Sequence, residues 1–198
     1  MMRVMKFLKT MMALAVCILW GGETAAQELT PRLYWPAPQG TKVLVAGYSH
    51  ASGDVFFDRS IPLYGVDSRI NVGILAYLHT LGLWGRTSNF LVELPYTWGN
   101  TKGAVGQTRA RRDFSDFGDL KFTLTVNLLG APSMTPQDFL EFRASPQPIV
   151  GASLKVVAPT GQYESNRLIN IGANRWATRA QLGSVIPLSP SWLLELEA

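Results

Sequence analysis

The feature that most constrains the fold is an unbroken alternation of polar and apolar residues from Asp119 to Leu128. The apolar residues are Leu120, Phe122, Leu124, Val126 and Leu128, and the polar residues between them are Asp119, Lys121, Thr123, Thr125 and Asn127. Successive side chains of a strand point to opposite faces, so a period of two predicts a β-strand with one apolar face.

Six further segments alternate in the same way, which predicts an all-β chain with about seven strands. Their bounds are Lys42–Ser52, Ile70–His79, Ser88–Trp98, Val150–Ala158, Trp176–Val185 and Ser191–Glu197. The facing of the first segment is ambiguous. A strand of about ten residues is long enough to cross a bilayer when it is tilted.

The connections between these strands alternate in length. The long ones are Gly53–Val66, Gly99–Ser115 and Pro159–Arg175, and the short ones are Gly82–Arg86 and Pro187–Pro190. Long outer loops and short periplasmic turns are typical of an antiparallel up-and-down transmembrane β-barrel. A soluble periplasmic β-sandwich shows the same period of two and is the alternative.

One connection breaks this alternation. Gly130–Pro148 is long although it falls on the periplasmic side. Within it, Thr135-Pro136-Gln137-Asp138 resembles a capping box with proline at the first helical position. We therefore expect one short helix in this periplasmic connection, ending near Phe142.

The first 26 residues have the features of a secretory signal peptide. Three cations precede an apolar run, Met11–Trp20, and Thr24-Ala25-Ala26 provides small residues at a cleavage site. The apolar run is too short for a membrane-spanning helix, which needs roughly 20 residues. The sequence thus predicts a signal peptide over 1–26 and a partial barrel domain over 27–198, exported to the bacterial outer membrane.

Composition agrees with this assignment. Only 16% of the residues are charged and 47% are hydrophobic, against an average charged fraction of about 25%. The single cysteine, Cys17, excludes a disulfide framework. We assign no metal, no cofactor and no nucleic-acid partner. Asp54, Asp58 and Asp67 offer carboxylates, but their spacing matches no known calcium loop.

Aromatic residues provide an independent test of the barrel topology, since Trp and Tyr favour the two membrane interfaces. The predicted interface aromatics lie at the ends of the predicted strands: Trp84, Tyr96, Trp98, Trp176 and Trp192.

If the more apolar face of each strand meets lipid, the other face lines a lumen. The predicted lining residues are Asn71, Tyr77, His79, Glu93, Asp119, Lys121, Thr123, Thr125, Asn127, Ser153, Lys155, Arg179 and Gln181. Charges of both signs suit a salt-bridged, filled interior as well as a polar conduit. On the same face, Gly73 and Gly151 indicate either a bend or room for another segment or ligand. Pro95 lacks an N–H and predicts a bulge or local break.

No catalytic constellation emerges, so we expect no enzyme activity. His50 and His79 are the only histidines, and the neighbouring Ser49 and His50 of a strand point to opposite faces. No nucleophile elbow, P-loop or dinucleotide fingerprint is present. The basic run Arg109-Ala110-Arg111-Arg112, in a predicted outer loop, is suited to solubility or to the phosphates of lipopolysaccharide.

Several stretches resemble one family of outer-membrane transporters, named for the meta pathway of phenol degradation. They are Gly47–Val55, Leu94–Gly99, Phe117–Asp119, Asn127–Pro132 and, most extensively, Ile149–Trp176, which reads IVGASLKVVAPTGQYESNRLINIGANRW. The resemblance implies an outer-membrane barrel, surrounded by lipid and lipopolysaccharide, that passes small hydrophobic or aromatic compounds. It supplies no catalytic or binding residues. The alternative function is a plugged binding or structural barrel without transport.

Family members continue through further strands after the point where this chain stops. A bacterial barrel needs an even number of strands, at least eight, to leave no edge in lipid. Seven predicted strands do not close, so the sequence is expected to be a fragment of a larger barrel. Closure by oligomerisation is the alternative, and the oligomeric state is open.

Overall fold

The computed structural model describes residues 30, 32–54, 63–105, 108–167, 170–189 and 192–198. The predicted signal peptide, residues 1–26, lies outside the described residues. Within them, the strands are β1 (Lys42–Asp54), β2 (Leu63–Leu83), β3 (Arg86–Val105), β4 (Thr108–Phe117), β5 (Leu120–Leu129), β6 (Ile149–Ala158), β7 (Ala177–Ser189) and β8 (Trp192–Glu197). Helix α2 (Pro136–Ala144) lies between β5 and β6.

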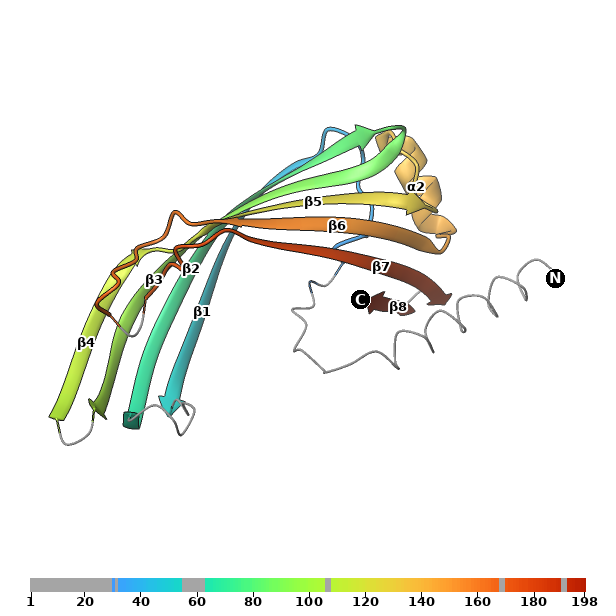
Figure 1. The fold of residues 1–198 in the computed structure, drawn as a ribbon. Helices are drawn as coiled ribbons and strands as arrows, with labels where there is room; N and C mark the ends of the chain where they lie inside the picture. The colour runs from blue at the N-terminus through green and yellow to red at the C-terminus, as the bar shows by residue number, and fades with distance from the viewer. Residues whose placement is uncertain (1–29, 31, 55–62, 106–107, 168–169, 190–191) are drawn as a thin grey trace.

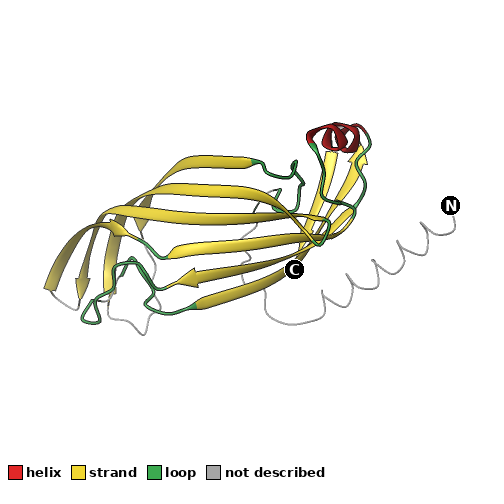
Figure 2. Ribbon diagram, turned by 90° about the horizontal axis from the view of Figure 1, so that it is seen from above, coloured by secondary structure: helices red, strands yellow, loops and turns green. Residues whose placement is uncertain are grey.

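All of these strands join one antiparallel sheet with the order β1-β2-β3-β5-β6-β7-β8, and β4 also pairs with β3. The sheet curls strongly into an open half-barrel (Figures 1 and 2). The up-and-down order confirms the predicted barrel-type fold. It excludes the β-sandwich alternative, because the described strands form one curled sheet rather than two packed sheets. No helix in the described ranges is long and apolar enough to span a membrane.

Seven of the strands match the predicted ones, but the long outer loop predicted over Gly99–Ser115 is wrong. This region forms a hairpin made of the end of β3 and the whole of β4, with Asn100 opposite Asp113 and Lys102 opposite Arg111. The alternation of apolar and polar residues could not reveal it, since both faces of this hairpin carry polar side chains. Strands β2 and β3 therefore run for 21 and 20 residues.

A break separates β4 from β5 at Gly118 and Asp119. Tyr96 pairs with Phe117 and Glu93 pairs with Lys121, so three steps along β3 face four steps along β4 and β5. The extra residue is a β-bulge. It lies opposite Pro95, whose carbonyl accepts a hydrogen bond from the Gly118 N–H at 2.8 Å. The local break predicted from Pro95 is confirmed.

The capping-box prediction for the helix is also confirmed. Thr135 is the N-cap of α2, and its hydroxyl accepts a hydrogen bond from the Asp138 N–H. The Asp138 carboxylate in turn accepts one from the Thr135 N–H at 3.0 Å. This reciprocal arrangement satisfies two of the amide donors left open at a helix start.

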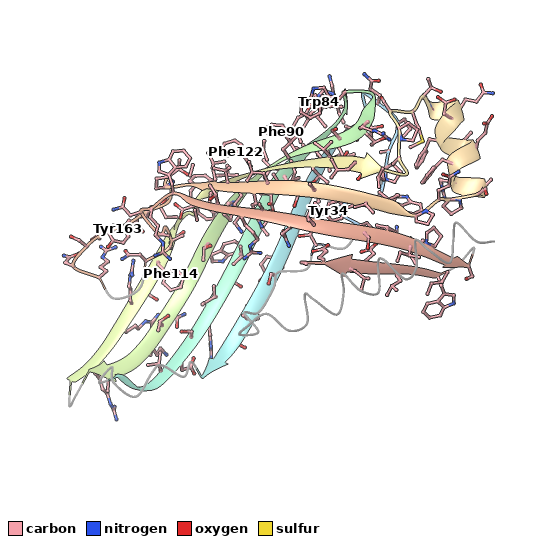
Figure 3. The ribbon with its side chains drawn as sticks, turned by 45° about the vertical axis from the view of Figure 1, so that its right-hand side comes forward. Tyr34, Trp84, Phe90, Phe114, Phe122 and Tyr163 are labelled. Atoms are coloured by element: carbon pink, nitrogen blue, oxygen red, sulfur yellow. The ribbon has the colours of Figure 1, made fainter. Side chains whose placement is uncertain are left out.

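The concave side of the sheet can be recognised from a buried segment that packs on it. Tyr34, in the chain that precedes β1, is only 2% exposed and packs with Ala131, Ile149 and Val185 in a small core. Figure 3 shows Tyr34 beside β6 and β7, whereas Phe90 and Phe122 project from the other, convex face. Residues that share the face of Tyr34 therefore point inward.

Candidate functional site

The centre of the concave face is formed by one row of side chains that runs across six strands. Directly opposed residues in antiparallel strands lie on the same face. The register therefore places on this inner row Val43, Leu78, Leu91, Thr123, Lys155 and Arg179, in the order of the strands from β1 to β7. The first half of the row is apolar, and the last two members are cations.

The next row toward the outer loops begins and ends with apolar residues and carries its charges in the middle. It consists of Val45, Ala76, Glu93, Lys121, Val157 and Ala177. Glu93 and Lys121 are directly opposite each other. In the two rows together, the side chains on β1 and β2 are all apolar, and the four charged side chains lie on β3, β5, β6 and β7. We call these rows the inner girdle.

The segment that precedes β1 packs against the inner face below the inner girdle. The Tyr34 ring lies against two glycines paired across β6 and β7, since a Cβ added to Gly151 or Gly183 would come within 2.2 or 2.1 Å of it. The Tyr34 hydroxyl donates to Ser153 Oγ at 3.3 Å, and the Tyr34 carbonyl accepts from Asn127 Nδ2 at 3.0 Å. Burial raises the pKa of the Tyr34 phenol, so the side chain is neutral at physiological pH.

Gly151 thus provides room for another segment of the chain, one of the two meanings expected for it. Gly73 has a different role: the Trp98 ring of the neighbouring strand covers it, 3.5 Å from the position that a Cβ would occupy. Both glycines lie beneath an aromatic ring, but on opposite faces of the sheet.

Above the inner girdle, the β6–β7 connection is tied to the bulge by Asp119. Its two carboxylate oxygens accept hydrogen bonds from the Gly161 N–H and the Ala173 N–H, both at 2.8 Å. A Cβ on Gly118 would lie 3.0 Å from the Pro95 ring and 3.7 Å from Ile171. Because Pro95 is on the inner face, this connection reaches inward over the rim of the girdle.

The predicted lining residues do not share one face. Glu93, Lys121, Lys155 and Arg179 belong to the inner girdle, Asn127 supports Tyr34, and Asp119 holds the β6–β7 connection. The register places Asn71, Tyr77 and His79 on the outer face instead, opposite Trp98, Val92 and Phe90.

The facing expected for β2 is therefore wrong, and the reason is physical. The apolar set of β2, including Ala76 and Leu78, was expected to meet lipid, but the inner wall is itself apolar at this strand. Asn71 lies on the outer face of β2, opposite Trp98. Its side-chain oxygen accepts from the Tyr48 hydroxyl at 2.7 Å and lies 2.8 Å from His50 Nδ1.

Three of the predicted interface aromatics, Trp84, Trp176 and Trp192, lie at the ends of described strands. Tyr96 and Trp98 do not: they lie in the middle of β3, because that strand continues to Val105. Tyr96 and Trp98 project outward and form a row with Tyr48 and Phe117, with ring centroids 5.0 to 6.0 Å apart. Trp176 is exposed immediately before β7. At the opposite end, Trp84 occupies the β2–β3 turn and Trp192 begins β8, both exposed.

The basic run over residues 109–112 is part of β4 rather than of a loop. Arg111 is on the outer face, and its guanidinium forms an ion pair with Asp113 at 2.8 Å. Arg112 points to the other face. The described residues contain no group of three His, Cys, Asp or Glu side chains that could hold a metal ion.

A family model described as "Putative MetA-pathway of phenol degradation" matches residues 45–198. This chain belongs to that phenol-degradation family. The match covers all strands described above except the beginning of β1. Among curated proteins, none matches the sequence.

A solved structure shares the fold of this family member. It is an outer membrane channel from Pseudomonas putida F1, with a TM-score of 0.58 and 24% sequence identity. The alignment covers 86% of this chain and 58% of that chain. The described half-barrel therefore corresponds to little more than half of the channel's length.

Proposed function

We propose that this member of the phenol-degradation family is part of an outer-membrane conduit for small hydrophobic or aromatic compounds. Its membership of the family and the fold that it shares with an outer membrane channel support this proposal. The observation that carries it is the inner girdle. A polar pore for ions and sugars would not need apolar side chains on the inward faces of β1 and β2. A path for apolar solutes would need such side chains.

The outer face supports a position in the membrane. Leu44 and Leu182, at the two sides of the half-barrel, are 70% and 59% exposed. The outer aromatic row that contains Tyr48 and Tyr96 crosses β2 at Gly73, and Gly73 is ten residues from the end of β2 at Leu83. Ten residues at about 3.3 Å each, tilted by about 40°, span roughly 25 Å, the height of a barrel's apolar band. We therefore assign the face between this row and Trp84 to lipid.

The same proposal includes export by the predicted signal peptide and contact with lipopolysaccharide beyond the aromatic row. There β2, β3 and β4 continue with polar outer side chains, among them Arg69, Lys102 and Arg111. Such cations can contact lipid phosphates.

A plugged binding or structural barrel is the second candidate, and Tyr34 favours it. The Tyr34 ring is buried against two glycines, and the residue is hydrogen-bonded at its hydroxyl and at its backbone carbonyl, so it belongs to a well-packed segment. If the segment that contains Tyr34 stays in place, solutes can bind to the inner girdle but cannot move past this segment.

Conductance separates the two candidates. The full chain would be reconstituted in planar bilayers and recorded with and without toluene, beside a Tyr34→Ala variant. Conductance that toluene blocks supports the conduit. An inserted protein that is silent, but that conducts after Tyr34→Ala, supports the plug. Silence of both proteins after verified insertion contradicts transport.

A further inference from the structure

The Tyr34 side chain is itself a phenol bound to the inner face of the sheet (Figure 3). Its ring covers Gly151 and Gly183, since a Cβ on either glycine would lie 2.2 or 2.1 Å from a ring carbon. Its hydroxyl donates to Ser153 Oγ, one row nearer to the inner girdle. Two glycines under a ring and a hydroxyl at its edge form a site with the shape and polarity of a phenol.

Tyr34 does not satisfy all the polar atoms around it. Thr125 is only 2% exposed, and its Oγ1 has no hydrogen-bond partner among the described residues. Most buried polar atoms have such a partner, and an unpaired one is costly. The bond from Tyr34 to Ser153 measures 3.3 Å, longer than the usual distance of about 2.7 Å between two hydroxyls. The Tyr34 phenol therefore fits the outline of the site better than its hydrogen-bonding pattern.

The register shows which ring position faces the unpaired hydroxyl. Thr125 is directly opposite Ser153 across β5 and β6, so their Cβ atoms are about 5 Å apart. The Cδ1–Cε1 edge of the Tyr34 ring lies against Gly151 of β6, and the Cδ2–Cε2 edge lies against Gly183 of β7. Because β5 and β7 flank β6 on opposite sides, Cε1 is on the side of Thr125.

Cε1 is bonded to the ring carbon that carries the hydroxyl. A second hydroxyl at this position would point to the side of Thr125, while the first stays at Ser153. A ring with two hydroxyls on adjacent carbons is a benzene-1,2-diol. In benzene-1,3-diol the second hydroxyl would lie at Cδ1, which already lies against Gly151.

We propose that benzene-1,2-diols bind at the Tyr34 site, which we define as Thr125, Ser153, Gly151 and Gly183, and that they replace the Tyr34 side chain there. The two hydroxyls pair with Ser153 and Thr125, and the ring covers the glycines. Replacement of Tyr34 releases its segment from the inner face below the inner girdle. This inference rests on the proposed function, because it names a solute class and the step by which that solute opens its own path.

The test measures binding of benzene-1,2-diol, benzene-1,3-diol and phenol to the full chain in detergent by calorimetry. Tyr34→Ala should bind the 1,2-diol at least about 10-fold more tightly than the wild type does, because the solute no longer competes with Tyr34. In Tyr34→Ala, the 1,2-diol should also bind at least about 10-fold more tightly than the 1,3-diol, since only the 1,2-diol pairs with both hydroxyls of the site. Equal affinity for the two diols would overturn the proposal.

A second substitution tests the role of Thr125. Thr125→Val keeps the shape of the side chain but removes its hydroxyl. Added to Tyr34→Ala, it should bring the affinity for the 1,2-diol to within about 2-fold of that for phenol and leave phenol unchanged. Thr178→Val, on the outer face of β7 opposite Val156, is the matched control and should change no affinity. A Thr125→Val variant that behaves like Thr178→Val would contradict the assignment.

A measurement on the wild-type protein tests the replacement of Tyr34 even if Tyr34→Ala fails to fold. The Trp35 N–H donates to the Arg32 carbonyl at 3.1 Å within the segment that carries Tyr34. Saturating benzene-1,2-diol should increase hydrogen exchange of the Trp35 amide about 5-fold or more, because the segment leaves the inner face. Benzene-1,3-diol should not. Unchanged exchange with bound 1,2-diol would overturn the replacement.

These outcomes can be told apart from failure of the conduit itself. A silent bilayer together with a preference for the 1,2-diol would reject transport and leave the Tyr34 site standing. Conductance that toluene blocks, together with equal binding of both diols, would reject the Tyr34 site as a diol site and leave the conduit standing.

Discussion

At the scale of single residues, the inner face depends on glycines that leave space for one aromatic ring. Gly151 and Gly183 are paired across β6 and β7, and the Tyr34 ring occupies the position that their side chains would need. Glycine weakens a strand interior, so its use here is explained by the close approach of another segment. Tyr34 in turn donates a hydrogen bond from its hydroxyl and accepts one at its backbone carbonyl.

Gly151→Ala is therefore expected to destabilise the protein by about 1 to 3 kcal/mol, the usual cost of overpacking. The new methyl group would lie 2.2 Å from Tyr34 Cδ1. Gly47→Ala is the matched control on the inner face of β1, where the nearest atom is 4.0 Å away. Thermal unfolding measured for both variants checks the prediction, and equal melting temperatures would contradict the packing of Tyr34 on Gly151.

A second residue-scale prediction concerns Asp119. Hydrogen bonds to a charged acceptor contribute about 1.5 to 3 kcal/mol each, and Asp119 accepts two from the β6–β7 connection. Asp119→Ala should release this connection and increase the rate of tryptic cleavage at Arg167 and Arg175 about 10-fold or more.

Asp116→Ala is the control for Asp119→Ala, because the hydrogen bond that Asp116 accepts among the described residues comes from the N–H of its neighbour Phe117. Cleavage of the Asp119→Ala variant at the wild-type rate, in a correctly folded protein, would mean that the connection is held by other contacts.

At the scale of elements, α2 shows how a local signal alone can start a helix. None of its residues is fully buried. Phe142, near its end, packs against the small core and the Trp35 ring, and the cap is the feature that fixes its start. Hydrogen bonds from the backbone and side chain of Thr135 lower the pKa of the Asp138 carboxyl from its ordinary value of 3.8. A carboxyl with a lowered pKa stabilises the fold above its unfolded pKa and loses that contribution as pH falls.

We therefore expect α2 to fray below about pH 4, as Asp138 becomes protonated. Thr135→Ala should produce the same fraying at neutral pH, since it removes the acceptor of the Asp138 N–H. Hydrogen exchange of the Asp138 and Phe139 amides measures both effects. Glu141→Gln removes a charge from α2 outside the capping box, and similar exchange in this control and in Thr135→Ala would argue against the cap.

At the scale of the whole molecule, the two faces of one sheet meet different surroundings. On β6, Leu154 projects outward and is 48% exposed, while Lys155 beside it points inward. The proposed orientation assigns the outer side to lipid and the inner side to an aqueous or solute-filled space. This difference can be measured by placing the same charge on each face.

Leu154→Arg is expected to cost about 2 to 4 kcal/mol in a bilayer, as charges do near the midplane of a barrel. Ala177→Arg, on the inner girdle of β7, should cost much less because its charge does not face lipid. Unfolding in vesicles with a denaturant provides both values. A larger cost at residue 177 than at residue 154 would reverse the assignment of the faces.

The sequence by itself determined most of the strand pattern and the local breaks. Alternation marked seven of the strands, Pro95 marked the bulge, and Thr135 with Asp138 marked the start of α2. Each of these signals is local, because a strand face, a missing N–H or a cap is set by residues a few positions apart. The cations of the inner girdle were also found in this way, since β5, β6 and β7 have one polar face.

Only the tertiary structure decided the facing of β2, the hairpin of β3 and β4, and the roles of Tyr34 and Asp119. Polarity separates the two faces of a strand only when their surroundings differ in polarity. Both faces of β2 are largely apolar, and both faces of β4 are largely polar, so neighbouring strands had to supply the facing. Tyr34 is 119 residues from Ser153 and Asp119 is 54 from Ala173. Contacts across such distances depend on how the sheet curls, which no local pattern specifies.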